Sequence, residues 1–555
     1  MDLDPKDSMG DNLVWNKAEN FQLYANQFYG WTRDLQNSTD YQSGLSDGVH
    51  SDYRSDLICT SSMNTYSMGT NVIPEKDDNF TALYKRIYYT NLLLKNAADF
   101  SNKAAIATPM GEAYFFRAYL HFELVQIYGD AQILTEPLDI DHEKLYGSRN
   151  NRSEVIDLCV SDLQQAISLL PEKAAEEGRL CKDAARAFLS RVALYEGTWQ
   201  KYHYSNTSRA SYLLNIAKTQ ADDVIKGKHY EIFYNSALVN SGISNTNQSY
   251  RYMFILEDLQ CNPAGLQKKD NTEYIFSHRH RLTDKMPLNV TKAMLANTCW
   301  VTRKMAQMYL CTDGLPIDKS PLFKGYTNPA DEFQNRDARM DNSLLWHGEQ
   351  YWNNDSKWRT AWNDGDLTSC LTANVRSNSG YQTQKWGVEH EVANYYEAMD
   401  YPVIRYGEVL LNFAEAIYEL RGSISDADLN KSLNLLRKRA NLPNLTNDFV
   451  SANGLNMLNE IRRERTVELF LEGFRIDDLK RWKTAETEMP QDQLGVLYTG
   501  TWYATQWTGQ SRPISTSGCI ELYSGRTWAQ KNYLYPLPLN QQKLNPNLTQ
   551  NPGWE

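Results

Sequence analysis

The stretch Asn459–Lys483, NEIRRERTVELFLEGFRIDDLKRWK, is the most strongly patterned segment of the chain. Glu464, Glu468 and Glu472 recur every four residues, so their carboxylates would stand in one row on a helix. Gly473 interrupts the pattern, and we expect it to end one helix or bend it into the next. The carboxylates are surrounded in sequence by arginines, namely Arg462, Arg463, Arg465, Arg475 and Arg481.

Two interpretations of this carboxylate row compete. Paired Asp or Glu groups perform acid–base chemistry on glycosides, so the row admits a catalytic role. Neighbouring arginines, however, favour the ionised form of a carboxylate, which cannot donate a proton. We therefore interpret the stretch as a structural clasp of ion pairs between helices.

The same stretch resembles a known family. The arrangement E-R-x-x-E-L-x-x-E-G-x-R-x-x-D-L-x-R-W, from Glu464 to Trp482, is similar to a signature of the SusD/RagB proteins. Two other long segments are similar to the same family, namely Ala113–Asp130 and Tyr401–Ala416. Members of this family are glycan-binding lipoproteins on the outer membrane of Bacteroidetes.

Shorter segments also resemble motifs of the family, and they occur along the chain in the same order as in the family. They include Cys311–Ile317, CTDGLPI, and the tail Tyr533–Trp554, in which Trp554 stands where the family has Tyr. Near the start, Leu3, Asp4 and Pro5 resemble the text that follows the lipid-carrying cysteine of the family. That cysteine is absent here, so we interpret Met1 as an added start, and the resemblance implies a lipid anchor outside this chain.

Helical periodicity dominates both ends of the sequence. Apolar residues recur at helical spacing in 81–100, 111–129, 153–170, 181–197, 211–226, 401–421 and 426–440. In 181–197 and 211–226, small residues alternate with large ones, which suits tetratricopeptide-like packing of helix pairs. The family resemblance favours the same arrangement. We predict an all-α dominated fold, in which a tetratricopeptide-like scaffold carries a loop-rich irregular subdomain.

The division into regions follows the change in composition. Residues 1–230 are predicted to form an N-terminal helical region with a binding loop in 37–80, and residues 401–555 a C-terminal helical region that completes the scaffold. Residues 231–400 have weak apolar periodicity and many Asn, Ser, Gly, Asp and Trp residues, so we expect an irregular subdomain there. Residues 490–530 are also loop-like, and they carry Trp502, Tyr503, Trp507 and Trp528.

Composition excludes several classes of function. The net charge of the 555 residues is −11, and there is no basic stripe of the kind that nucleic acid needs. No apolar run reaches the roughly 18 residues of a membrane-spanning helix. The sequence also lacks the common zinc, phosphate-loop, nucleophile-elbow and dinucleotide motifs, so we expect no cofactor or metal. The eight scattered cysteines form no C-x-x-C pair, and we expect most of them to be buried.

Binding residues are predicted from aromatic side chains in polar surroundings. Aromatics make up 12% of the chain, with 35 Tyr and 14 Trp. A flat ring can stack on the apolar face of a sugar, while amides and charged groups bind its hydroxyls. The resemblance implies contacts from the first long loop and from the irregular subdomain. The predicted ligand-binding residues are Tyr53, Asn64 and Tyr66 in the loop, and Trp300, Trp346, Trp352 and Trp358 in the subdomain.

The resemblance implies a cell-surface lipoprotein that captures a glycan and hands it to a SusC-like TonB-dependent transporter of the outer membrane, without turnover. One alternative is a helical glycoside hydrolase that uses carboxylates such as Glu464, Asp364 or Asp366. The last two flank Gly365, a pattern typical of a solvated turn. Another alternative is a structural lid of the transporter, or a protein whose ligand is a peptide.

Overall fold

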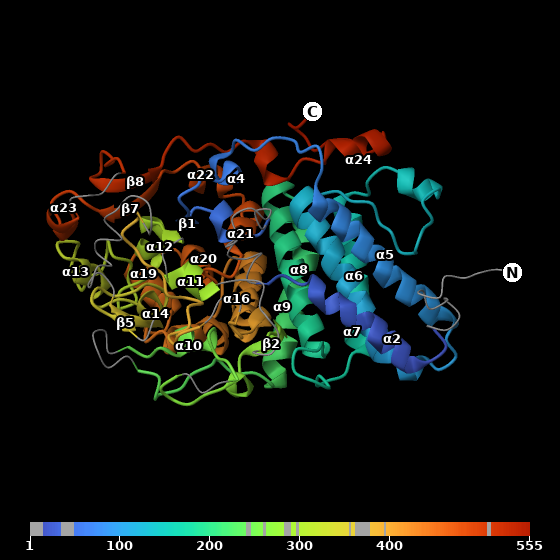
Figure 1. Ribbon diagram of the computed structural model, residues 1–555, viewed down its shortest axis with the longest axis horizontal. Helices are drawn as coiled ribbons and strands as arrows, with labels where there is room; N and C mark the ends of the chain where they lie inside the picture. The colour runs from blue at the N-terminus through green and yellow to red at the C-terminus, as the bar shows by residue number, and fades with distance from the viewer. Residues whose placement is uncertain are drawn as a thin grey trace.

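The computed structural model describes residues 15–34, 49–239, 246–258, 262–281, 290–295, 299–354, 357–360, 378–392, 396–507 and 512–555. Figure 1 shows two halves: long helices pack side by side at one end, and short helices, strands and loops fill the other. The predicted fold class, a helical scaffold with a loop-rich part, is confirmed.

The helical half is built from neighbouring helices in chain order. α5 packs against α6, α6 against α7, α7 against α8, and α8 against α9. α16, from the C-terminal part of the chain, packs against α9 and so continues the series. The helices and 3-10 turns of this half are α2 (Ala18–Ala25), η1 (Asn26–Trp31), α5 (Asp78–Asp99), η3 (Lys103–Ile106), α6 (Ala107–Tyr128), η4 (Glu143–Tyr146), α7 (Arg152–Leu169), α8 (Lys182–His203), α9 (Thr207–Gly227) and α16 (Tyr406–Arg421).

The α8–α9 pair shows why the sequence forms this scaffold. Ala184, Ala187 and Phe188 on α8 are buried, as are Ala217 and Ala221 on α9. Small residues let two helix backbones approach closely, while the large residues between them fill the remaining space. The predicted pairing of these two helices is therefore confirmed.

The loop-rich half contains short elements. Its strands form antiparallel pairs, β1 with β3, β2 with β6, β4 with β5, and β7 with β8. The strands are β1 (Ile58–Cys59), β2 (Tyr274–His278), β3 (Trp300–Val301), β4 (Gln350–Asn354), β5 (Lys357–Thr360), β6 (Tyr401–Arg405), β7 (Gln493–Leu497) and β8 (Cys519–Tyr523).

The remaining helices are short, and most of them belong to this half. They are η2 (Asp52–Arg54), α4 (Thr65–Met68), α10 (Ser249–Met253), η5 (Lys268–Asp270), α11 (Val290–Leu295), α12 (Arg303–Met308), α13 (Pro329–Phe333), α14 (Ala338–Ser343), α17 (Asp426–Lys431), α18 (Leu433–Arg439), α19 (Asn447–Ala452), α20 (Met457–Glu468), α21 (Arg475–Arg481), α22 (Ala485–Glu488), α23 (Trp502–Gln506), η6 (Gln530–Tyr533) and α24 (Leu539–Leu544).

One predicted helix begins later than expected. The segment 401–421 was predicted as helical throughout, but its first five residues form strand β6, which pairs with β2. Pro402 lies within that strand, at a position where a helix interior would lose a hydrogen bond. The helical part, α16, begins only at Tyr406.

Two further expectations concern cysteines and the membrane. Cys59, Cys159, Cys181, Cys299, Cys311 and Cys519 are all buried free thiols, as predicted for most of the cysteines. Within the described ranges, no helix combines the length and the apolar character that crossing a bilayer requires.

Candidate functional site

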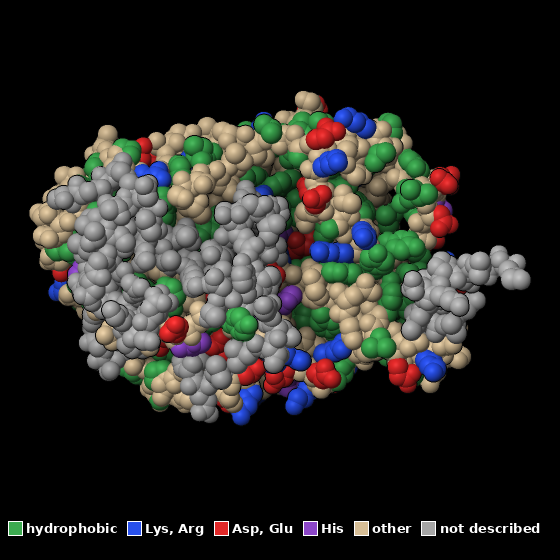
Figure 2. Space-filling model, in the orientation of Figure 1, with side chains coloured by type: hydrophobic (Ala, Val, Ile, Leu, Met, Phe, Trp, Pro, Cys, Tyr) green, Lys and Arg blue, Asp and Glu red, His purple; other side chains and the backbone are tan. Residues whose placement is uncertain are grey.

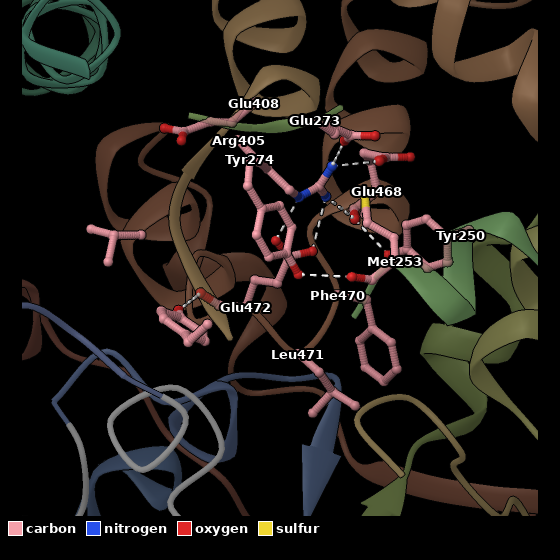
Figure 3. A network of polar contacts seen from close by, with 12 residues as sticks. Tyr250, Met253, Glu273, Tyr274, Arg405, Glu408, Glu468, Phe470, Leu471 and Glu472 are labelled. Carbon is pink, nitrogen blue, oxygen red and sulfur yellow. Dashed lines mark hydrogen bonds and ion pairs between the residues drawn. The ribbon is translucent and has the colours of Figure 1, made fainter. Parts of the chain in front are cut away.

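The carboxylate row of Asn459–Lys483 lies in a buried network of charges (Figure 3). Glu464 and Glu468 are on α20, and Glu472 follows in the turn before α21. Arg405, at the end of β6, donates to Glu468 Oε1 at 2.8 Å, to Glu472 Oε2 at 2.7 Å and to Glu273 Oε1 at 2.7 Å. One guanidinium therefore joins three carboxylates from two segments of the chain.

Further cations complete the network. Arg339 Nη1 lies 2.5 Å from Glu464 Oε1 and 2.9 Å from Glu468 Oε2. Arg439 binds Glu468 as well, and Lys385 Nζ lies 2.8 Å from Glu472 Oε1. Burial opposes the charged form of Glu468, but the arginines outweigh burial and hold the pKa of this carboxyl well below its usual range.

This geometry confirms the clasp interpretation. Glu464, Glu468 and Glu472 are 2%, 0% and 2% exposed, so none offers a surface that a substrate can reach. Asp364 and Asp366, the other carboxylates considered for catalysis, lie outside the described residues.

The predicted binding residues of the first loop are mostly enclosed. Tyr66 is 2% exposed, stacks on Tyr535 with ring centroids 4.7 Å apart, and donates its hydroxyl to Asn532 O at 2.8 Å. Tyr53 is 4% exposed. Asn64 caps α4, because its side chain accepts from Ser67 N at 2.9 Å. A ligand would reach these rings only after a rearrangement.

The predicted tryptophans are divided between core and surface. Trp300 in β3 is 4% exposed and lies beneath the Arg512 guanidinium, 4.8 Å from its ring centroid. Trp352 in β4 is 5% exposed. Trp358 lies in β5, opposite Asn353. Trp346 is half-buried and packs against Phe333 with ring centroids 5.6 Å apart. Their role in binding stays a prediction.

Trp346 belongs to a partly exposed group of rings at the loop-rich end. We call Phe333, Trp346, His347 and Trp502 the loop-end aromatic surface. His347 and Trp502 lie 5.1 Å apart with their planes at 78°. All four residues are half-buried, so part of each is exposed to solvent. The group draws on residues 333–347 and on Trp502, which is far from them in sequence.

Local structure holds these rings in place. Glu349 N donates to Trp346 O at 3.0 Å, and Trp346 N donates back to Glu349 Oε2 at 3.2 Å, so the chain turns at Gly348 with φ +88°. Trp502 N donates to Thr327 O at 2.9 Å, which ties α23 to the loop before α13. Asn328, Gln334, Asn335 and Gln506 are exposed amide residues close in sequence to the segments that carry these rings.

The sequence pattern singled out only Trp346 of this group as a binding residue. Trp502 lies in the loop-like 490–530 segment, but nothing in the sequence places that segment beside 344–350. His347 and Phe333 carried no signal of their own. In the described part of the chain there is no cluster of three or more His, Cys, Asp or Glu side chains that could hold a metal ion.

Comparisons with known proteins agree with this architecture. Residues 260–554 match the family model described as the SusD family, and residues 2–194 match a model described as starch-binding, associating with the outer membrane. A SusD-like carbohydrate-binding protein from Bacteroides fragilis NCTC 9343 superimposes with a TM-score of 0.73 at 21% identity, over 97% of this chain and 100% of that one.

Two more relatives are informative. A second SusD-like protein of Bacteroides fragilis has a TM-score of 0.72 at 22% identity, over 99% of this chain and 100% of that one. The SusD-like protein P25 of Formosa agariphila is 33% identical over 129 residues, which are 22% of this chain and 24% of that protein. The sequence match thus spans about a quarter of this curated relative, whereas the structural likeness covers whole chains.

Proposed function

Because this chain belongs to the SusD family, we propose that it binds an oligosaccharide or polysaccharide at the outer face of the outer membrane and delivers it to a SusC-like TonB-dependent transporter. A lipid anchor at the N-terminal side would hold it at the cell surface. The function is binding without turnover. The family match over residues 260–554 carries the proposal.

The description of the second family model supports both the ligand class and the place. It names starch binding and association with the outer membrane, and it matches residues 2–194. The buried, ion-paired state of Glu464, Glu468 and Glu472 also favours binding over hydrolysis, since these carboxylates cannot reach a glycosidic bond.

We assign the glycan contact to the loop-end aromatic surface. Trp346 and Trp502 are partly exposed, so a sugar could stack on their rings, and the exposed amide residues close in sequence could bind its hydroxyls. Affinity should be modest, because the hydroxyls of the sugar lose hydrogen bonds to water on binding. The other predicted contacts stay predictions. Four of them are buried and thus less accessible than Trp346, namely Tyr53, Tyr66, Trp300 and Trp352. The remaining two are Asn64 and Trp358.

A glycan-array screen followed by titration calorimetry tests this assignment. The Trp346→Ala/Trp502→Ala variant should lose at least tenfold in affinity, because each ring–sugar stack contributes on the order of 1 kcal/mol or more. Tyr88→Ala is the matched control, since Tyr88 is an exposed aromatic residue on α5, and it should bind like the unaltered protein. Unchanged affinity of the double variant would move the site elsewhere.

Two outcomes would replace the proposed function. Release of reducing ends from a polysaccharide, abolished by one Asp or Glu substitution, would make the protein a hydrolase. Absence of binding across the glycan array, together with binding of oligopeptides, would make the cargo a peptide.

Delivery to the transporter is tested in cells. The Trp346→Ala/Trp502→Ala variant should slow glycan uptake, whereas normal uptake would favour a purely structural lid.

A further inference from the structure

A charged cleft lies apart from the loop-end aromatic surface and shares no lining residue with it. It consists of two adjoining cavities of about 450 and 290 Å³. The loop between α7 and α8 forms one side, and β2 with η5 forms the other. Glu176, Glu177, Arg179, Ser277 and Arg279 line both cavities. β2 lies near the lower edge of the molecule in Figure 1, and Figure 2 shows charged side chains gathered along that edge.

The floor of the cleft is a fixed set of ion pairs. Lys268 Nζ lies 2.7 Å from Asp400 Oδ1, and Arg279 Nε lies 3.2 Å from Asp400 Oδ2. Arg279 also pairs with Glu177 across the opening. Because the Lys268 and Asp400 side chains are only 4% and 7% exposed, this floor is held in one arrangement before any ligand arrives.

Two tyrosines stand in the walls of the larger cavity. The Tyr274 hydroxyl donates to Met253 O at 3.1 Å, and the Tyr230 hydroxyl lies 3.6 Å from Cys181 Sγ. Both side chains are half-buried and line the cavity. Their polar ends are therefore engaged, while part of each ring borders the open space where a sugar ring could pack.

The side chains that line the cleft include slightly more cations than carboxylates. Each carboxylate that lines it has a cation within ion-pair distance: Lys182 for Glu172, Arg179 for Glu176, Arg279 for Glu177, and Lys268 for Asp400. Lys173 and Lys269 also line the larger cavity, and among the described residues neither has a carboxylate within 4.0 Å. Two exposed ammonium groups that make no ion pair with a described residue thus border this cavity, although the whole chain has a net charge of −11.

We propose that this charged cleft is a second binding site and that it takes an oligosaccharide carrying carboxylate or sulfate groups. Lys173 and Lys269 bind the anionic groups, and the rings of Tyr230 and Tyr274 pack against the sugar. The inference rests on the proposed glycan-binding function and adds to it a preference for anionic sugars at a place distinct from the aromatic surface. A compact ammonium attracts an anion without the paired geometry of a guanidinium, so carboxylate and sulfate are both accommodated.

Calorimetry on the full chain tests the proposal with three ligands of equal length: an oligogalacturonate, a sulfated galacto-oligosaccharide and the neutral galacto-oligosaccharide. The Lys173→Gln/Lys269→Gln variant should lose at least tenfold in affinity for one or both anionic ligands. Lys85→Gln/Lys95→Gln is the control, because it removes two exposed charges from α5, where neither lysine has a described ion pair. Its affinity for the anionic ligands should stay within twofold of that of the unaltered protein. Binding should also weaken as salt is raised.

A second variant tests the cavity itself without a change of charge. Ala174 lines the larger cavity on the loop before α8, and Ala174→Trp should fill it and lower affinity for the anionic ligands. The proposal is overturned if neutral and anionic ligands bind alike, or if the lysine and Ala174 variants keep the affinity of the unaltered protein. It is also overturned if no anionic ligand binds.

The aromatic variant and the glycan panel distinguish failure of the second site from failure of the proposed function. Trp346→Ala/Trp502→Ala should keep its affinity for anionic ligands in the charged cleft. If neutral glycans bind the unaltered protein but anionic ones do not, only the second site is wrong. If nothing on the glycan panel binds, the proposed function fails together with it.

Discussion

At the scale of single residues, Arg405 holds the centre of the molecule together. Its guanidinium donates to three carboxylates and to the backbone oxygen of Glu468, and it is 1% exposed. Such a cation is stable in the interior only because each of its donors has an acceptor. The carboxylates depend on it in the same way.

Arg405→Met should therefore be severely destabilising. The substitution leaves Glu273, Glu468 and Glu472 with less counter-charge in a buried place, and breaking one side of a buried pair costs roughly 3–5 kcal/mol. Urea unfolding measures the loss. Arg463→Met is the control, because Arg463 makes a part-exposed ion pair with Glu460 at 3.4 Å. We expect this substitution to lower the free energy of unfolding by less than about 1 kcal/mol. Equal effects of the two changes would show that the network contributes little.

At the scale of elements, the turn between α20 and α21 decides how the carboxylate row meets its partners. α20 ends at Glu468 and α21 begins at Arg475. Between them Leu471 has φ +60° and Gly473 has φ +75°, both in the left-handed region. The Asp52 carboxylate accepts from Leu471 N at 2.8 Å and so fixes the turn from outside.

Gly473→Ala should destabilise the protein by about 1–2 kcal/mol, because a residue with a Cβ is strained at this φ. Gly30→Ala serves as the control: Gly30 is exposed, its φ lies outside the left-handed region, and no atom lies within 4 Å of an added Cβ. Thermal unfolding of the two variants gives the comparison. A Gly473→Ala protein as stable as the control would mean that the turn relaxes without cost.

A second element-scale junction joins the first loop to the scaffold. His50 Nε2 lies 2.7 Å from Glu123 Oε2 on α6, and His50 Nδ1 lies 2.6 Å from Asp477 Oδ2 on α21. Arg33 Nη2 lies 2.9 Å from Glu123 Oε1. Burial opposes ionisation of Glu123, but Arg33 and His50 prevail and lower its pKa to about 2.

This junction predicts a loss of stability in acid. Because the pKa of Glu123 is lowered from 4.5 to about 2 on folding, its contribution of about 3 kcal/mol is complete above pH 4.5 and disappears as the pH falls towards 2. Glu123→Gln should thus be destabilised at pH 7, and the gap to the unaltered protein should narrow between pH 4.5 and 2. Glu136→Gln, at an exposed ion pair with Lys144, controls for general charge effects. A constant gap across this range would contradict the assignment.

The elements also show where prediction from sequence succeeds and fails. The helices of the scaffold were predictable because each buries one face, which leaves a 3.6-residue period in the sequence. Strand β6 was not, because five residues before a helix carry too short a pattern. Exposure of the rings was least predictable: Tyr66 is covered by Tyr535, and Trp300 lies beneath Arg512. Those partners are distant in sequence, so no local pattern announces them.

At the scale of the whole molecule, buried contacts tie the scaffold to the C-terminal helices. Arg191 on α8 lies 2.6 Å from Glu408 on α16. Arg481 on α21 lies 2.6 Å from Glu415 on α16, and it donates to Thr198 on α8 at 3.2 Å. Buried ion pairs therefore join region 1–230 to region 401–555, and the Arg339–Glu464 pair joins region 231–400 to region 401–555. The division of the chain into these three regions stays a prediction.

We expect a single cooperative transition in differential scanning calorimetry, because separating the regions would leave these charges buried without partners. Near- and far-ultraviolet circular dichroism should then report the same midpoint. Two resolved transitions, or midpoints that differ between the two signals, would show instead that the regions unfold on their own.

The buried network also limits how this sequence can change over time. Glu468 contacts Arg339, Arg405 and Arg439 at once. Loss of the charge at any one of these positions therefore leaves the others buried with less counter-charge. Substitutions here are tolerated only in compensating sets, since residues within one network are strongly coupled. Relatives that carry a different residue at one of these four positions should therefore differ at a second, and the surface loops can diversify towards new sugars while the centre stays the same.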